Sequence, residues 1–128
     1  MGRPILKYLL DSVILIDHLN AIPPATAFLQ EHGHACALSA ITRAEVQASL
    51  ENNAVGSLAR ELLDLFPTLP LTAETADLAA RLRKTRHLKH PDAFQAAVAV
   101  LNRLVLVTRN TRDFGSGSGL RVLVPYRL

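Results

Sequence analysis

Short apolar runs alternate along the chain with segments of helical periodicity. Continuous apolar runs are typical of strands that are buried on both faces of a sheet. Such runs occupy residues 5–10, 104–108 and 120–124, with a weaker candidate at 35–39. Helix-start residues followed by apolar positions at helical spacing predict helices over residues 23–32, 42–52, 55–66, 72–85 and 91–102, and a short one after Asp11.

The alternation of strands with helices predicts the fold class. We expect an α/β protein with a central parallel sheet and helices on both faces. The sequence shows no internal repeat, and the Gly/Ser stretch at 115–119 lies too near the end to link two domains. The prediction is therefore one domain over residues 1–128. In sheets of this kind, function sits at the carboxyl ends of the strands.

Four acids fall just after the predicted strands or at the starts of the helices that follow: Asp11, Glu45, Asp92 and Asp113. Each also has a structural interpretation. Asp11 is a favourable helix N-cap, and Thr42 with Glu45 has the pattern of a capping box. A negative charge at Asp92 is favoured in the first turn of a helix, and Asp113 suits a turn. Taken one at a time, the acids leave both roles open.

The expected position of all four acids at one edge of the sheet favours a shared function. Two like unit charges about 4 Å apart near a protein surface repel by roughly 4 kcal/mol, so clustered carboxylates hold either protons or a cation. Oxygen ligands without a Cys or His cluster beside them select Mg²⁺ or Mn²⁺ over Zn²⁺. Such an ion activates water and polarises phosphate groups. The sequence therefore predicts phosphodiester hydrolysis.

The charge is distributed unevenly along the chain. The net charge is +3, but residues 1–80 carry four Lys or Arg against nine Asp or Glu, and residues 81–128 carry ten against two. A basic half favours a polyanion as partner, although a modest surface bias is an equally good explanation. Aromatic residues make up 5% of the chain and Trp is absent, so phosphate contacts rather than base stacking should dominate affinity for nucleic acid.

A basic stretch just before Asp92 is the candidate for binding this polyanion. It contains five permanent cations and no acid, and it leads directly into the helix predicted from residue 91. The alternative is a solvated last turn of the preceding helix, where the helix dipole favours positive charge. The five candidate residues are Arg81, Arg83, Lys84, Arg86 and Lys89.

Other features argue against several classes of protein. The single Cys36 cannot form an internal disulfide, and this cysteine usage favours a cytoplasmic protein. No apolar run approaches the roughly 18 residues of a membrane span, and acids at positions 11 and 17 interrupt any signal peptide. The histidine pairs lack a third ligand at zinc-like spacing. A phosphoryl-accepting signalling domain needs a late lysine, and none follows Lys89.

Four motifs in this order resemble those of PIN-domain proteins, in particular VapC-type toxin ribonucleases of toxin–antitoxin pairs. They read YLLDSVILIDHL at 8–19, LSAITRAEV at 38–46, HPDAFQAAVA at 90–99 and LVLVTRNTRDF at 104–114. The resemblance spans residues 6–124. It implies a three-layer α/β/α domain and an endoribonuclease that uses Mg²⁺ or Mn²⁺ to cleave RNA. It also implies a homodimer, and inhibition by a cognate VapB-type antitoxin whose tail occupies a groove near the site.

The resemblance also assigns roles to individual residues. Two residues after Asp11, where family members commonly have Asn or Ser, this chain has Val13, and some relatives have an acid at the position of Asn110. These departures keep a non-catalytic RNA-binding or antitoxin-binding module open as the alternative to an enzyme. The motif matches are Asp11 and Asp92 as main metal ligands, Glu45 and Asp113 as acids that complete the site and position water, and Thr108 and Asn110 as pocket-shaping residues.

Overall fold

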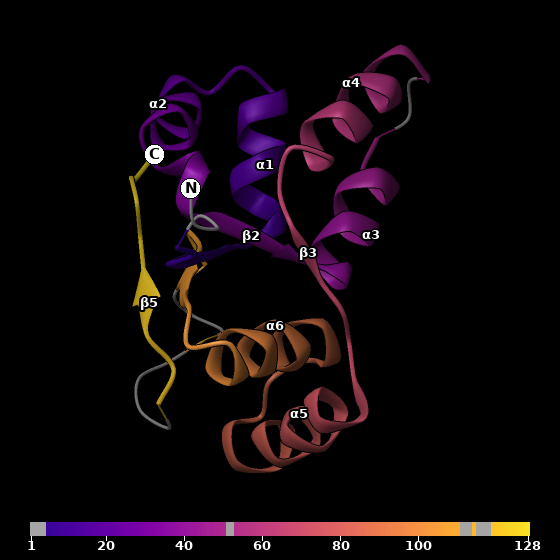
Figure 1. Ribbon diagram of the computed structural model, residues 1–128, viewed down its shortest axis with the longest axis vertical. Coiled ribbons are helices and arrows are strands. Elements are labelled where there is room, and N and C mark those ends of the chain that lie inside the picture. The colour runs from indigo at the N-terminus through magenta and orange to yellow at the C-terminus, as the bar shows by residue number, and fades with distance from the viewer. Residues whose placement is uncertain (1–4, 51–52, 111–113, 115–118) are drawn as a thin grey trace.

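The sheet at the centre of the molecule is parallel throughout. In the computed structural model, which describes residues 5–50, 53–110, 114 and 119–128, five strands pair in the order β3-β2-β1-β4-β5. The first strand of the chain therefore lies in the middle of the sheet (Figure 1). The strands are β1 (Tyr8–Leu10), β2 (Cys36–Ser39), β3 (Thr68–Leu69), β4 (Val105–Val107) and β5 (Val122–Leu123).

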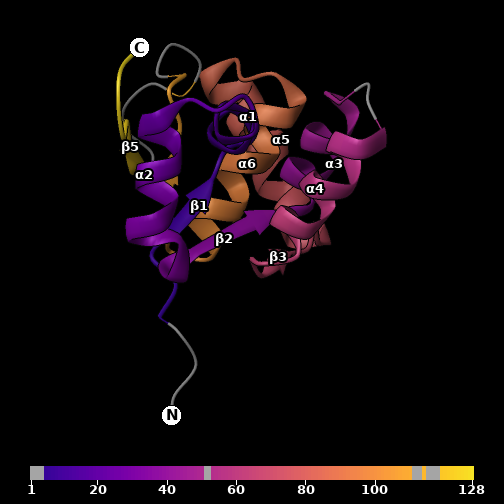
Figure 2. The same cartoon turned by 90° about the horizontal axis from the view of Figure 1, so that it is seen from above.

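Helices cover both faces of this sheet and make three layers (Figures 1 and 2). Helices α1 and α2 lie over one face with α3 and α4 beside them, whereas α5 and α6 cover the other. Within the described residues no single helix is long and apolar enough to span a membrane. The helical segments Ser12–Leu19 and Pro23–Ala35 meet the length and composition criteria only when taken together, and they are bent by 117° relative to each other. The helices are α1 (Ser12–Leu19), α2 (Pro23–His32), the 3₁₀ turn η1 (Gly33–Ala35), α3 (Ala40–Ala48), α4 (Asn53–Leu63), α5 (Ala73–Arg86) and α6 (His90–Leu101).

Neighbouring residues of β1 pack into different cores, one on each face of the sheet. Leu9 belongs to the core formed with α5 and α6, and Leu10 to the core formed with α1, α2 and α4. Both leucines are fully buried, and burial of each side chain contributes about 1.5–3 kcal/mol. These two cores explain the continuous apolar runs of the sequence. The predicted α/β class, with a parallel sheet between helical layers, is confirmed.

Strand β3 and the end of α4 differ from the sequence prediction. Strand β3 is not predicted, because it is only two residues long and Thr68 is exposed, which leaves no apolar run to detect. The helix predicted over residues 55–66 ends at Leu63. Phe66 continues the apolar pattern because its ring packs in the same core beyond the end of the helix.

The start of α3 corrects the predicted capping box. The helix begins at Ala40, and its N-cap is Ser39, whose Oγ accepts a hydrogen bond from the backbone N–H of Thr42 at 3.2 Å. The Thr42 hydroxyl donates to the carbonyl of Leu10 at 3.1 Å and so ties α3 to the end of β1. Thr42 is therefore not the helix cap, and the capping role predicted for Glu45 is wrong.

Candidate active site

Asp11 lies at the carboxyl end of the central strand and is the N-cap of α1. The residue is 9% exposed, and its carboxylate accepts three hydrogen bonds. Oδ1 accepts from the backbone N–H of Ser12 at 2.9 Å and from Nε2 of Gln95 at 3.3 Å, and Oδ2 accepts from the Thr108 hydroxyl at 2.7 Å. The N-cap role predicted for Asp11 is confirmed, and three donors from different elements fix the carboxylate in place.

The pairing of β1 with β4 brings the segment that begins at Thr108 next to Asp11. Leu10 lies opposite Val107 in the sheet, and the backbone N–H of Asp11 donates to the Val107 carbonyl at 2.9 Å. Besides donating to Asp11, the Thr108 hydroxyl accepts from the backbone N–H of Asn110 at 3.0 Å. The two predicted pocket-shaping residues therefore adjoin Asp11 through one hydroxyl group.

The charges of Asp11 and Asp92 act on Glu45, which is half-buried in α3. Burial raises the pKa of Glu45, and the Asp11 charge raises it further; a hydrogen bond with the Ser12 side chain opposes them, and the Asp92 charge adds a smaller increase. Asp92 lies in the first turn of α6, as predicted. Two of the four predicted acids, Asp11 and Asp92, are thus close enough to Glu45 for their charges to disfavour its ionised form.

These acids fit a hard divalent cation in their chemistry and charge. Their ligand atoms are carboxylate oxygens, which Mg²⁺ and Mn²⁺ prefer. Burial is the main cause of the raised pKa of Glu45, and the negative charges of Asp11 and Asp92 add to it. Among the side chains that the structure describes, no group of three or more His, Cys, Asp or Glu residues is already arranged to hold a metal ion. Asp113, the fourth predicted acid, lies outside the described residues.

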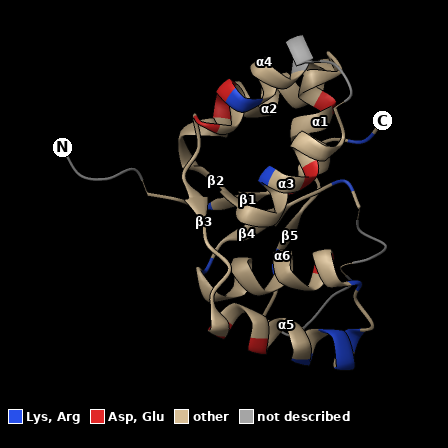
Figure 3. Cartoon of the chain, turned by 90° about the vertical axis from the view of Figure 1, so that its right-hand side faces the viewer, with Lys and Arg blue, Asp and Glu red and all other residues tan. Residues whose placement is uncertain are grey.

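The basic stretch forms the end of α5 and the turn that leads into α6 (Figure 3). Arg81, Lys84 and Lys89 are exposed. Arg83 is partly buried, and its Nη1 donates to the Leu88 carbonyl at 2.8 Å, so it stabilises the turn. Arg86 is also partly buried and is the last residue of α5. The exposed cations are therefore the ones available to a polyanion.

Three polar residues that the sequence analysis did not select complete the surroundings of Asp11. Gln95 is 1% exposed, and its amide group forms hydrogen bonds with Asp11, Thr42 and Ser39. Ser39 ends β2, and Thr42 lies in the first turn of α3. The signal in the sequence is that Gln95, three positions after Asp92, is the polar residue in the stretch AFQAAVA at 93–99, whose other residues are apolar.

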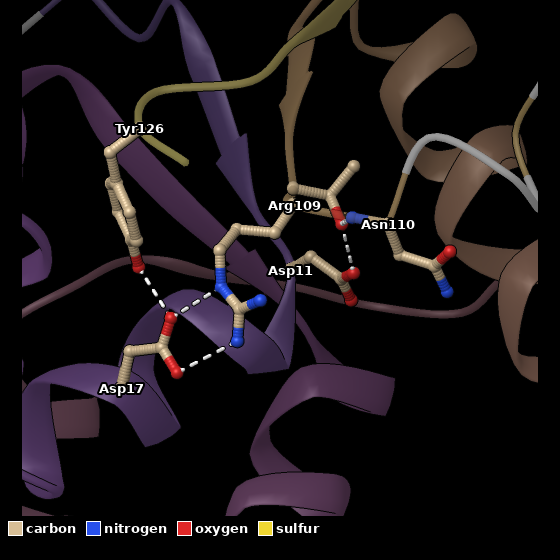
Figure 4. Close-up of polar contacts among 6 residues, drawn as sticks. Asp11, Asp17, Arg109, Asn110 and Tyr126 are labelled. Atoms are coloured by element: carbon tan, nitrogen blue, oxygen red, sulfur yellow. Dashed lines mark hydrogen bonds and ion pairs between the residues drawn. The ribbon is translucent and has the colours of Figure 1, made fainter. Parts of the chain in front are cut away.

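A second polar cluster, also missed, lies beside this site and consists of Asp17, Arg109 and Tyr126 (Figure 4). Arg109 donates to Asp17 through Nε at 2.6 Å and Nη2 at 3.0 Å, and the Tyr126 hydroxyl donates to Oδ2 at 2.7 Å. Burial raises the pKa of Asp17, but Arg109 and Tyr126 outweigh it and hold the pKa below its usual value. The cluster ties α1, the segment after β4 and the C-terminal segment together.

This cluster predicts a stability difference that depends on pH. Because the folded-state pKa of Asp17 is lowered, its contribution is present above the unfolded-state pKa of about 3.9 and is lost as pH falls through the folded-state value. We expect urea unfolding to show wild type more stable than Asp17→Asn at pH 7, with the difference shrinking as the pH falls below about 4. A difference that grows on acidification would contradict the assigned direction.

The fold and the site define a class of protein, a three-layer α/β/α protein with acidic side chains at the carboxyl edge of a parallel sheet. The chain belongs to the PIN domain family, whose sequence profile matches residues 8–116. Members of this family are generally metal-dependent nucleases. The resemblance inferred from the four sequence motifs is therefore confirmed.

Several solved structures are similar to this chain over nearly its whole length. A chain of a toxin–antitoxin complex from Klebsiella pneumoniae is 33% identical, with a TM-score of 0.84 and coverage of 95% of this chain and 100% of that one. A chain of FitAcB from Neisseria gonorrhoeae is 26% identical, with a TM-score of 0.72 and coverage of 94% of this chain and 99% of that one. A chain of VapBC2 from Rickettsia felis, solved with a promoter DNA fragment, shares the fold. It is 19% identical, with a TM-score of 0.79 and coverage of 92% of this chain and 98% of that one. No curated protein sequence matches.

Proposed function

We propose that this chain is the toxin of a toxin–antitoxin pair and acts as an endoribonuclease that hydrolyses RNA phosphodiester bonds with Mg²⁺ or Mn²⁺. The observation that carries the proposal is the placement of three acids at the carboxyl edge of the sheet: Asp11 directly after β1, Glu45 on α3 and Asp92 in the first turn of α6. The effect of the Asp11 and Asp92 charges on Glu45 supports this placement. The PIN family and the 33% identical chain of a toxin–antitoxin complex support it.

In this proposal Asp11 and Asp92 are the main ligands of the cation, and Glu45 and Asp113 complete the acidic site. A bound divalent cation would polarise the scissile phosphate and lower the pKa of a water molecule. Asp11 is suited to its role because three donors already hold the carboxylate rigidly. Glu45, with its raised pKa, is suited to orient the attacking water and accept its proton.

The proposed partners are an RNA substrate, a cognate VapB-type antitoxin and a second copy of the chain, in the cytoplasm. The antitoxin is supported by the 33% identical chain, which comes from a toxin–antitoxin complex. RNA is supported by the exposed cations Arg81, Lys84 and Lys89, which precede the helix that carries Asp92.

The direct test is RNA cleavage by the purified chain. We expect Mn²⁺ or Mg²⁺ to produce internal cuts in a mixed RNA substrate, a chelator to abolish them, and excess Mn²⁺ to restore them. Single-stranded DNA of matched sequence is the control substrate. RNA binding without cleavage at any Mn²⁺ concentration would contradict the enzyme and favour the non-catalytic module.

One observation bears on that alternative. Val13 packs against the apolar core, so it supplies no polar contact to the site. The adjacent Ser12 supplies one instead, because its side chain forms a hydrogen bond with Glu45. The departure from the family pattern at Val13 therefore does not leave the acidic site without a hydroxyl neighbour.

The basic stretch predicts a salt-dependent loss of RNA affinity. In the double variant Arg81→Ala/Lys84→Ala, RNA binding measured in Ca²⁺ should weaken, and the slope of log K against log salt should fall by about 0.7 for each phosphate contact removed. The matched control is Arg60→Ala, which removes an exposed cation from α4. An unchanged slope in the double variant, or an equal change in the control, would show that RNA binds elsewhere.

A further inference from the structure

Gln95 is a buried amide on α6, at the meeting point of the elements that carry the three acids. We propose that Gln95 is a positioning residue that fixes the Asp11 carboxylate and aligns α3 and α6 with it for cation binding. This inference rests on the proposed function of the acidic site. Gln95 is 1% exposed, and its immediate helix neighbours Ala96, Ala97 and Val98 are apolar and buried.

The hydrogen bonds around Gln95 determine which way round its amide group lies. The Ser39 hydroxyl donates to Oε1 of Gln95, which uses the acceptor of the amide. The Thr42 hydroxyl donates its one hydrogen to the carbonyl of Leu10, so its oxygen accepts a hydrogen bond from Nε2 of Gln95 at 2.7 Å. The second hydrogen of Nε2 is directed to Asp11 Oδ1 at 3.3 Å.

A reversed amide would be unfavourable in these surroundings. It would turn the carbonyl oxygen of Gln95 toward two acceptors, Thr42 Oγ1 and the Asp11 carboxylate, and its NH₂ group toward Ser39. Because the surroundings are buried, unmatched acceptors are costly. Ser39 and Thr42 therefore set the orientation of the amide, and the amide presents a donor to Asp11.

The same amide links the segments that carry the other two acids. Asp92 lies three residues before Gln95 on α6, and Glu45 lies three residues after Thr42 on α3, so each acid is on the same face of its helix as its hydrogen-bonding neighbour. The contact between Gln95 and Thr42 therefore holds α6 against α3. One side chain thereby couples the positions of all three acids.

The test is Mn²⁺ binding by calorimetry to wild type, Gln95→Met and Gln30→Met. Methionine preserves volume but removes the donors, whereas Gln30 is an exposed glutamine of α2 and serves as the matched control. We expect the dissociation constant of Gln95→Met to rise about tenfold or more, the range found when a hydrogen-bonding partner of a metal ligand is removed. Gln30→Met should bind like wild type.

A second readout separates positioning from simple destabilisation. If Gln95 positions Asp11, RNA cleavage by Gln95→Met should be slow at low Mn²⁺ and largely recover at high Mn²⁺. A destabilised variant would instead show fewer active molecules with an unchanged dissociation constant, and that result would overturn the inference.

A third variant covers the case in which Gln95→Met does not fold. Ser39→Ala removes the hydroxyl that orders the amide without touching Asp11, and should raise the dissociation constant for Mn²⁺ about threefold. Equal affinity of wild type and the variants overturns the positioning role alone. Absence of Mn²⁺ binding by wild type would instead overturn the proposed function on which the inference rests.

Discussion

Replacing Asp11 by Asn should lower the rate of RNA cleavage by about 10³-fold or more while leaving the protein folded. The carboxylate is the central proposed ligand, and loss of cation stabilisation of a phosphate transition state costs several kcal/mol. Asparagine keeps the shape of aspartate and is itself a good N-cap. Its NH₂ group, however, would replace a carboxylate oxygen that accepts a hydrogen bond in the wild type, from the Ser12 N–H or from the Thr108 hydroxyl. We expect the free energy of unfolding to fall by only about 1–2 kcal/mol, measured by urea denaturation.

The matched control for this experiment is Asp77→Asn, which neutralises an exposed acid of α5 away from the candidate site. Its cleavage rate should equal that of wild type, and its unfolding free energy should change by less than about 0.5 kcal/mol. Cleavage by Asp11→Asn within about threefold of wild type would remove Asp11 from the site.

The largest stability effect is expected for Arg109→Met, which should lower the free energy of unfolding by about 2–3 kcal/mol at pH 7. Removing the guanidinium leaves the Asp17 carboxylate buried, and among the described side chains the Tyr126 hydroxyl is its remaining hydrogen-bond partner. Breaking one side of a buried ion pair is costly because the remaining charge is cut off from water. The partial exposure of Arg109, at 31%, keeps the effect below that of a fully buried pair.

Arg43→Met is the matched control because it breaks an arginine–aspartate pair at the surface. Arg43 contacts Asp64 at 3.0 Å, but the Asp64 side chain is 62% exposed. Water replaces the lost partner there, so the expected change is below about 1 kcal/mol. Equal losses in the two variants would contradict the importance assigned to burial at Asp17.

The sheet and its layers could be predicted from the sequence because burial leaves a local pattern. Leu9 and Leu10 face opposite cores, so β1 appears as an unbroken apolar run. Strand β3 leaves no such pattern, since its two residues include the exposed Thr68. The start of α3 was misplaced because Ser39 and Thr42 are both suitable caps, and a contact with Leu10 across the fold decides between them.

The acids could be selected from the sequence because parallel strands bring their carboxyl ends to one edge. The polar partners that organise the site could not be, because they are remote in the chain. Gln95 is 84 residues from Asp11, and Arg109 and Tyr126 are 92 and 109 residues from Asp17. Such pairings depend on how α6 and the C-terminal segment pack, which hydrophobic periodicity does not encode.

The proposed role of Asp11, Glu45 and Asp92 is to gather a catalytic cation at the carboxyl edge of the sheet. Its most direct test is the position of Mn²⁺ in crystals grown with the metal, located by anomalous scattering. We expect an anomalous peak within about 2.6 Å of an Asp11 carboxylate oxygen, the upper range for a hard cation and its oxygen ligands. Mn²⁺ bound only at a site that touches none of these three acids would contradict it.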